Sequence, residues 1–157
     1  MRELIIKHFG ELTTNELYEI LKLRVSVFVV EQNCPYQELD NLDLDAYHLF
    51  IKEENRIIAY LRTFKLDEYK NSYIKGSAPI RDVALIGRVV SAERRKGHAT
   101  TLLNAAVDLV KRNFCTSSIV LEAQVYAAQL YKNIGFVQTS EEFLEDGIPH
   151  IQMTLNC

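Results

Sequence analysis

Residues 83–91, VALIGRVVS, constrain the fold more than any other stretch of the chain. A short, almost wholly apolar run is typical of a central strand that is buried on both faces of a sheet. A basic loop follows it, and then comes the strongest helical pattern of the chain, over 97–114, with apolar residues on one face and polar residues outside. We therefore expect a sheet with helices packed against it.

The rest of the chain adds further strands and two more helices. Thr13 and Glu16 have the spacing of a capping box, which predicts a helix that begins there. The residue at which this helix ends is not predicted, because the β-branched residues over 25–30 disfavour a helix. The other elements expected are strands over 3–9, 47–52, 56–66, 118–123, 136–139 and 151–155, a helix over 125–133, and loops over 31–46, 67–80 and 140–149. This order predicts an α/β protein with a mixed sheet in three layers, or nearly so.

Composition narrows the classes of function. The 157 residues, 48% of them apolar, predict one soluble domain over 1–157. A net charge of −3 argues against a nucleic-acid partner, and no apolar run reaches the length of about 20 residues that spans a membrane. The three cysteines are far apart and are expected to be reduced thiols of a cytoplasmic protein. The four histidines are widely spaced, so we expect no metal.

The segment from Ala92 to Thr100 predicts an anion site. A strand that leads into a helix through a loop with Gly97 directs backbone N–H groups one way, and the helix dipole adds positive charge there. Arg94, Arg95 and Lys96 add formal charge. The glycine patterns of a Walker loop and of a dinucleotide-binding fold are both missing. An exposed basic helix start without a ligand remains the alternative.

Two motifs in register carry a resemblance to a known family. Arg94-x-x-Gly97-x-Ala99 fits the pattern Gln/Arg-x-x-Gly-x-Gly/Ala, and Ala127-x-x-x-Tyr131-x-x-x-Gly135-Phe136 follows after one helix and one strand. In both motifs the chain resembles the GNAT superfamily of acyl-coenzyme A-dependent N-acetyltransferases. Residues 27–43, 86–90, 123–124 and 145–150 resemble its ElaA-type group in particular.

The resemblance implies a GNAT-type fold with acetyl-coenzyme A as co-substrate. In the superfamily the pyrophosphate lies on the loop matched by 95–100, and the pantetheine arm pairs with the strand matched by Val89 and Val90. A bulge in that strand is usual, and Gly87 or Arg88 could accommodate it. The residues expected to bind the coenzyme are Val89, Val90, Arg94, Arg95, Lys96, Gly97, His98, Ala99, Thr100 and Gln124.

The implied reaction is direct attack of an amine on the thioester. Tyr131 matches the acid that protonates the departing thiolate, and the N–H of Val90 is the implied oxyanion donor. Glu122 is the first choice for the base. Glu31 and His150 are the next candidates and could also bind substrate, and a water relay could replace a dedicated base. The purely structural interpretations are a core role for Tyr131, an ion pair for Glu122, a solvated helix end for Glu31 and a packing role for His150.

The acceptor that the resemblance implies is a small amine or an exposed lysine or N-terminus. The sequence does not identify it, nor does it separate a monomer from a homodimer. A non-catalytic module that holds acyl-coenzyme A as a sensor is the competing function. The acidic residues of 38–45 lack the spacing of a calcium loop. We interpret them as a solvated loop whose negative field attracts a cationic amine, and we expect Arg24 to pair with a carboxylate.

Overall fold

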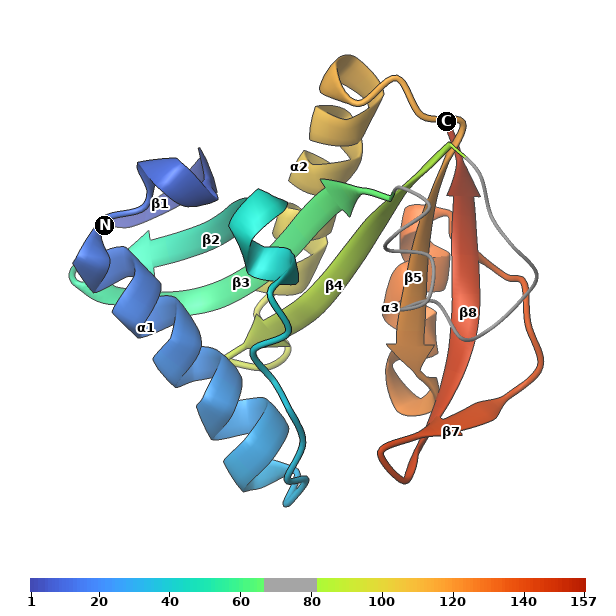
Figure 1. Ribbon diagram of the computed structural model, residues 1–157, viewed down its shortest axis with the longest axis horizontal. Coiled ribbons are helices and arrows are strands. Elements are labelled where there is room, and N and C mark those ends of the chain that lie inside the picture. The colour runs from blue at the N-terminus through green and yellow to red at the C-terminus, as the bar shows by residue number, and fades with distance from the viewer. Residues whose placement is uncertain (67–81) are drawn as a thin grey trace. The chain divides into compact units, whose positions relative to one another are not determined.

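The computed structural model describes residues 1–66 and 82–157 and follows the predicted order of elements with one added strand (Figure 1). In this part of the chain eight strands form one mixed sheet, in the order β1-β2-β3-β4-β5-β8-β6, with β7 paired to β8. The strands are β1 (Arg2–His8), β2 (Tyr47–Glu53), β3 (Arg56–Lys65), β4 (Val83–Ser91), β5 (Ser118–Gln124), β6 (Val137–Gln138), β7 (Phe143–Glu145) and β8 (Ile148–Asn156). The helices are α1 (Thr14–Arg24), a π-helix (Val25–Glu31), α2 (His98–Asn113) and α3 (Ala128–Ile134), with short 3₁₀ turns at Phe9–Glu11, Leu42–Asp45 and Val125–Ala127. The predicted fold class is confirmed; the loop expected over 67–80 lies outside the described residues.

The chain packs as two compact units. The first unit comprises Met1–Thr63 and Arg88–Ala105, and the second comprises Phe64–Gly87 and Ala106–Cys157. The second half of β4 and the first half of α2 therefore belong to the first unit. The remaining halves of these two elements belong to the second unit.

In the first unit α1 begins as the sequence predicts. The Thr13 hydroxyl accepts the Glu16 N–H at 3.0 Å, and the Glu16 carboxylate accepts the Thr13 N–H at 2.9 Å. This reciprocal capping box satisfies two N–H groups that the helix cannot satisfy itself. After Arg24 the α-helical pattern gives way to the π-helix Val25–Glu31, within the β-branched run where the sequence left the boundary open.

The core of the first unit lies between α1 and one face of the sheet. Ile20 and Leu23 of α1 pack with Phe50 of β2 and with Tyr60 and Val90. Burying each such side chain contributes about 1.5–3 kcal/mol. A register shift between β2 and β3 adds one residue to β3 at this point. Because of that extra residue, Ile57 lies in the same core cluster as Tyr60.

The second unit is built on β5 and β8. These strands pair antiparallel from Ser118↔Asn156 to Gln124↔His150, whereas the parallel register between β4 and β5 runs only from Val83↔Ser118 to Leu85↔Val120. Beside them α3 ends at Gly135, whose φ of +120° and N–H bonds to the Tyr131 and Lys132 carbonyls confirm the predicted cap. The last part of β5 therefore continues beyond its pairing with β4.

The prediction of a loop over 140–149 is wrong at two places, because β8 already begins at Ile148 and a further strand precedes it. Phe143–Glu145 forms β7, which pairs antiparallel with the start of β8. Asp146 and Gly147 connect the two strands, and their φ angles are +51° and +77°. Two positive φ angles in a two-residue connection are the signature of a tight hairpin, and Asp-Gly is a favoured sequence for it. The sequence therefore carried the signal for this hairpin.

Candidate active site

In β4 the backbone is distorted at Arg88, immediately before the expected coenzyme-pairing residues Val89 and Val90. Arg88 has a φ of +54°, and the left-handed region costs a non-glycine residue about 1–2 kcal/mol. Of the two positions that the sequence offered for a bulge, Gly87 and Arg88, it is Arg88 that adopts the left-handed conformation. The chain therefore changes direction just before Val89, and Val90 follows with its side chain in the core under α1.

At the start of α2 the backbone has the geometry of an anion site. Arg95 and Gly97 have φ angles of +61° and +78°, so the loop bends twice before the helix begins at His98. The Gly97 carbonyl accepts the N–H and the hydroxyl of Thr101, each at 3.1 Å. The N–H groups of the first turn, which includes Ala99 and Thr100, have no acceptor within the helix, and the positive end of the helix dipole lies there. A phosphate group can bind at such a helix start.

Charged side chains surround this helix start. Arg94, Arg95 and Lys96 are exposed, and Arg94 forms an ion pair with Glu31 at the end of the π-helix. Both partners of this pair are largely exposed, so solvent screening leaves the pair little effect on stability. Within the first unit the structure therefore brings Glu31 to the loop that precedes α2.

His98 differs from its neighbours because its side chain is buried. Its Nε2 atom lies 3.6 Å from Oε1 of Glu93. In the described part of the chain neither atom has a hydrogen-bond partner. The His98 ring is thus packed beneath the helix start, and its contribution to a phosphate site would come from its backbone N–H.

The second unit gathers polar side chains on one face of β5 and β8. Glu122 lies opposite Gln152, and Gln124 lies opposite His150. Cross-strand partners and residues two apart share a face, so these four side chains lie on the same face. Leu121 and Ala123, which alternate with them along β5, point to the opposite face. Three residues expected to act in the site, Glu122, Gln124 and His150, are thereby brought together.

The contacts of His150 fix its tautomer. Its Nδ1 atom lies 2.7 Å from the carbonyl oxygen of Ile148, and its ring stacks on Phe143 with centroids 6.0 Å apart. A carbonyl oxygen only accepts, so in the neutral ring Nδ1 carries the proton and Nε2 has the lone pair. His150 therefore has both a packing role and a basic nitrogen.

Tyr131 lies in α3 and is 7% exposed. Its ring meets that of Phe136 edge to face, with centroids 6.3 Å apart. Burial, with a smaller contribution from Tyr126, raises the pKa of the Tyr131 phenol well above its usual range. Among residues 1–66 and 82–157 its hydroxyl has no hydrogen-bond partner. The phenol is therefore protonated at neutral pH.

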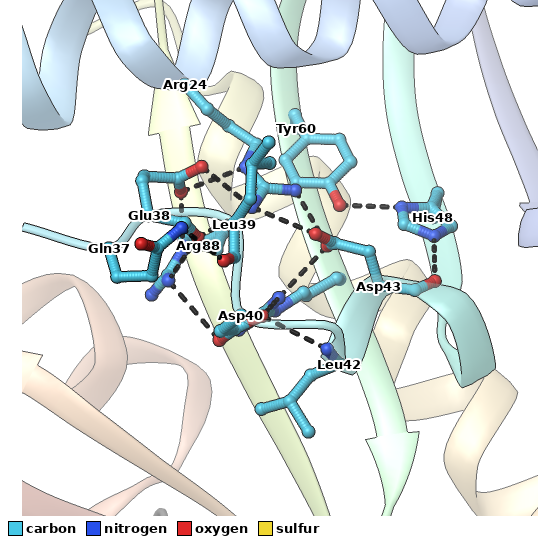
Figure 2. Close-up of polar contacts among 11 residues, drawn as sticks. Arg24, Gln37, Glu38, Leu39, Asp40, Leu42, Asp43, His48, Tyr60 and Arg88 are labelled. Atoms are coloured by element: carbon cyan, nitrogen blue, oxygen red, sulfur yellow. Dashed lines mark hydrogen bonds and ion pairs between the residues drawn. The ribbon is translucent and has the colours of Figure 1, made fainter.

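The sequence did not predict a buried network of three arginines and three carboxylates in the first unit (Figure 2). Arg24 is fully buried. Its guanidinium donates to both carboxylate oxygens of Glu38, at 3.0 and 2.9 Å, and to both of Asp43, at 2.7 and 3.2 Å. Arg62 donates to Asp40 at 2.7 and 2.8 Å and to Asp43 at 3.0 Å. The expected carboxylate partner of Arg24 is thus confirmed, and there are two such partners.

This network contradicts the interpretation as a solvated loop for three of the four acidic residues in 38–45; only Asp45 among them is exposed. Glu38 and Asp43 are buried, and Asp40 is half-buried. Burial alone would raise the pKa of Asp40 and Asp43, but hydrogen bonds and charge from the arginines outweigh it and lower both. Their negative charge is therefore matched by buried positive charge, and it does not supply the free field that was expected to attract an amine.

His48 extends the network to the sheet. Its Nε2 atom lies 2.9 Å from the carbonyl oxygen of Asp43, and its Nδ1 atom lies 2.6 Å from the Tyr60 hydroxyl. The carbonyl fixes the proton on Nε2, so Nδ1 accepts the hydroxyl proton of Tyr60. Burial lowers the pKa of His48, although contact with Asp43 opposes the shift. The ring is therefore held neutral as a bridge between two partners.

The described residues hold neither a candidate metal site nor a membrane-spanning helix. Within 1–66 and 82–157, no group of three or more histidine, cysteine or acidic residues is placed to hold a metal ion. In the same residues no helix is both long and apolar enough to cross a membrane. In the described residues no disulfide joins Cys34, Cys115 or Cys157.

Comparison with known proteins identifies the class. Residues 18–157 match the family described as an acetyltransferase (GNAT) domain. Since the match covers most of the chain, the protein belongs to the GNAT acetyltransferase family, whose members use acyl-coenzyme A as co-substrate.

Within this family, the chain is similar to proteins of the ElaA-type group. Protein ElaA of Escherichia coli is 34% identical over 150 residues, which cover 93% of this chain and 91% of ElaA. Its crystal structure superimposes with a TM-score of 0.84 over 98% of this chain and 99% of that one. An acyl-CoA N-acyltransferase from Pseudomonas aeruginosa is 39% identical, with a TM-score of 0.82 and coverage of 98% and 99%. The ElaA-type resemblance is therefore confirmed.

Proposed function

We propose that this protein transfers an acetyl group from acetyl-coenzyme A to a primary amine, which is a small molecule or an exposed lysine or N-terminus. The observation that carries the proposal is the start of α2. A family motif for the coenzyme coincides there with left-handed residues at Arg95 and Gly97 and with a free helical first turn. The expectation that the protein works in the reducing cytoplasm fits its three cysteines, which form no disulfide within the described residues.

The coenzyme is expected to bind through the first unit. Backbone N–H groups of 95–100 would receive the pyrophosphate, and Arg94 and Lys96 would add positive charge beside it. Val89 and Val90, after the distortion at Arg88, would pair with the pantetheine arm as an added strand does. The Val90 N–H would then stabilise the oxyanion. Gln124 is proposed as a further hydrogen-bonding partner of that arm.

The acceptor amine has to lose a proton before it can attack, because an ammonium group has no lone pair. Glu122 is the proposed base, since its carboxylate shares a polar face with other hydrogen-bonding groups. His150 is the second candidate because its Nε2 atom keeps a lone pair. Glu31 and a water relay are the third and fourth candidates, and the ion pair between Glu31 and Arg94 makes Glu31 weaker than His150.

Tyr131 is the proposed acid. The amine nitrogen forms a bond to the thioester carbon, and its second proton passes to solvent water as the tetrahedral intermediate collapses. The carbon–sulfur bond breaks, Tyr131 gives its proton to the sulfur, and the phenolate then regains a proton from solvent. Burial favours the neutral phenol, so Tyr131 holds its proton until a base, the departing thiolate, forms.

Thiol release from acetyl-coenzyme A, measured across a panel of amines and peptides, tests the proposal. Tyr131→Phe keeps the ring that contacts Phe136 and removes only the hydroxyl. We expect kcat to fall by about 10²- to 10⁴-fold, the usual contribution of general acid catalysis, with coenzyme affinity nearly unchanged. Tyr18→Phe is the matched control, because Tyr18 is an exposed tyrosine on α1. Coenzyme binding in calorimetry without acetylation of any amine would instead favour the non-catalytic sensor.

A further inference from the structure

The backbone conformation of Arg88 calls for a physical explanation. Arg88 has a left-handed φ of +54° within a strand, where an arginine gains nothing from that conformation by itself. Residues held in such regions persist only when their surroundings hold them there, and they cluster at functional sites. The contacts of its side chain supply the restraint.

The guanidinium of Arg88 makes four contacts with the segment 36–40. Nη2 donates to the backbone carbonyl of Glu38 at 2.8 Å, and Nε lies 2.5 Å from the Glu38 carboxylate. Nη2 also lies 3.4 Å from Asp40, and the guanidinium carbon lies 5.6 Å from the centre of the Tyr36 ring. The side chain is only one-fifth exposed, so solvent competes weakly for these contacts.

The segment that binds Arg88 is itself fixed from two sides. Arg24 of α1 holds the Glu38 carboxylate through two hydrogen bonds, and Arg62 of β3 holds Asp40 through two more. Paired hydrogen bonds of this kind fix direction as well as distance. As Figure 2 shows, Glu38 and Asp40 connect Arg88 to this network, so the distortion in β4 is anchored to both α1 and β3.

We propose that Arg88 is a positioning residue that sets the direction of the Val89 and Val90 N–H groups toward the thioester. The peptide plane that follows Arg88 is oriented by the backbone angles of Arg88, and Val90 is then fixed by its side chain in the core. Loss of the side chain would release the bend and turn the N–H groups away. This inference rests on the proposed function, because it assigns Arg88 a task within the same coenzyme site.

Arg88→Gly and Arg88→Ala separate the side chain from the backbone conformation. Glycine adopts a positive φ without strain and alanine does not, so Arg88→Gly should have the higher melting temperature of the two. Neither variant can bind Glu38. We therefore expect both to lose kcat by about 10- to 100-fold, the scale expected when reacting groups are misplaced by about 1 Å. Calorimetric affinity for coenzyme A should change by less than about threefold, because the helix start that receives the phosphates is untouched.

Two further variants complete the design. Arg88→Lys keeps the charge but not the planar fork, so it should recover only a minor part of kcat. Arg112→Ala removes an exposed arginine near the end of α2 and should behave as the wild type does. Wild-type kcat in Arg88→Gly, or full recovery by lysine, would overturn the proposal.

Amide hydrogen exchange separates this inference from the function on which it rests. Exchange at Val89 and Val90 should be faster in Arg88→Gly than in the wild type. If the wild type binds no acetyl-coenzyme A, the proposed function fails, and exchange alone then decides whether Arg88 restrains this strand. Unchanged exchange at both amides would refute that restraint.

Discussion

Asp43→Asn tests whether the arginine–carboxylate network stabilises the fold. Asp43 accepts hydrogen bonds from two arginines. Arg24 donates to it at 2.7 and 3.2 Å, and Arg62 donates at 3.0 Å. Asparagine keeps the shape of the side chain but removes the charge and places an NH₂ group, which is a donor, where one carboxylate oxygen accepted. The buried arginines would then face a neutral partner and, at one atom, another donor.

The magnitude follows from the burial of this site. Arg24 is 0% exposed and Asp43 is 7% exposed, so water cannot replace the lost acceptor. Removing one partner of a buried ion pair costs about 3–5 kcal/mol, because a charge is left without compensation. Glu38 and Asp40 continue to bind the arginines, which places the expected loss near the lower end of that range. Urea unfolding followed by circular dichroism measures it as a fall in the midpoint.

The pH dependence distinguishes charge from packing. The arginines hold the pKa of Asp43 below its ordinary value of about 3.9. The unfolded chain therefore takes up the proton first, so this contribution to stability is present above about pH 4 and is lost as the pH falls through the folded pKa. The difference between wild type and variant should shrink below about pH 4. The control is Asp108→Asn, at an exposed position on α2. A loss below about 1 kcal/mol at pH 7, or an equal loss at pH 7 and pH 3, would refute the reasoning.

Two further predictions concern single residues. Gly97→Ala should lower the free energy of unfolding by about 1 kcal/mol, because alanine resists the φ of +78° although its Cβ would meet no atom within 4 Å. The variant should also have a higher KM for acetyl-coenzyme A. An unchanged urea midpoint would contradict the stability prediction. His48→Gln should reduce the dependence of stability on pH. The lowered pKa of His48 lets the unfolded chain bind the proton first, so wild-type stability falls as the pH drops below about 6.5. Urea midpoints at pH 7.5 and 5.5 measure this fall, and equal slopes in both proteins would contradict it.

Local patterns were enough to predict most of the elements. The capping box at Thr13, the apolar strand over 83–91 and the glycine cap at Gly135 depend on neighbours close in sequence, and all three are confirmed. The strand at Phe143–Glu145 was missed although Asp146 and Gly147 marked a hairpin. A strand this short cannot show alternation, so only the turn chemistry could have revealed it.

The polar network could not be predicted in the same way. Its contacts join residues 14 to 50 positions apart, for example Arg24 with Glu38 and Arg88 with the carbonyl of Glu38. Pairing over such distances depends on the tertiary fold, and an acidic segment without its partners has the pattern of an ordinary solvated loop. The available signal was that Arg24, Arg62 and Arg88 each interrupt an apolar run, where an arginine requires a compensating charge.

The position of the left-handed residue in β4 shows why an arginine serves better there than the adjacent glycine. Gly87 would adopt a positive φ without strain, but a glycine has no side chain that could fix the bend to another element. Arg88 costs about 1–2 kcal/mol in that conformation. Its side chain gains charge-assisted hydrogen bonds to the Glu38 carbonyl and to Asp40, each contributing about 1.5–3 kcal/mol when buried, and an ion pair with the Glu38 carboxylate. The contacts stabilise this conformation by more than the backbone strain costs, so the backbone at Arg88 is held in one conformation. Exchanging the two residues, as in the double variant Gly87→Arg with Arg88→Gly, should therefore keep the composition and lose the rigidity.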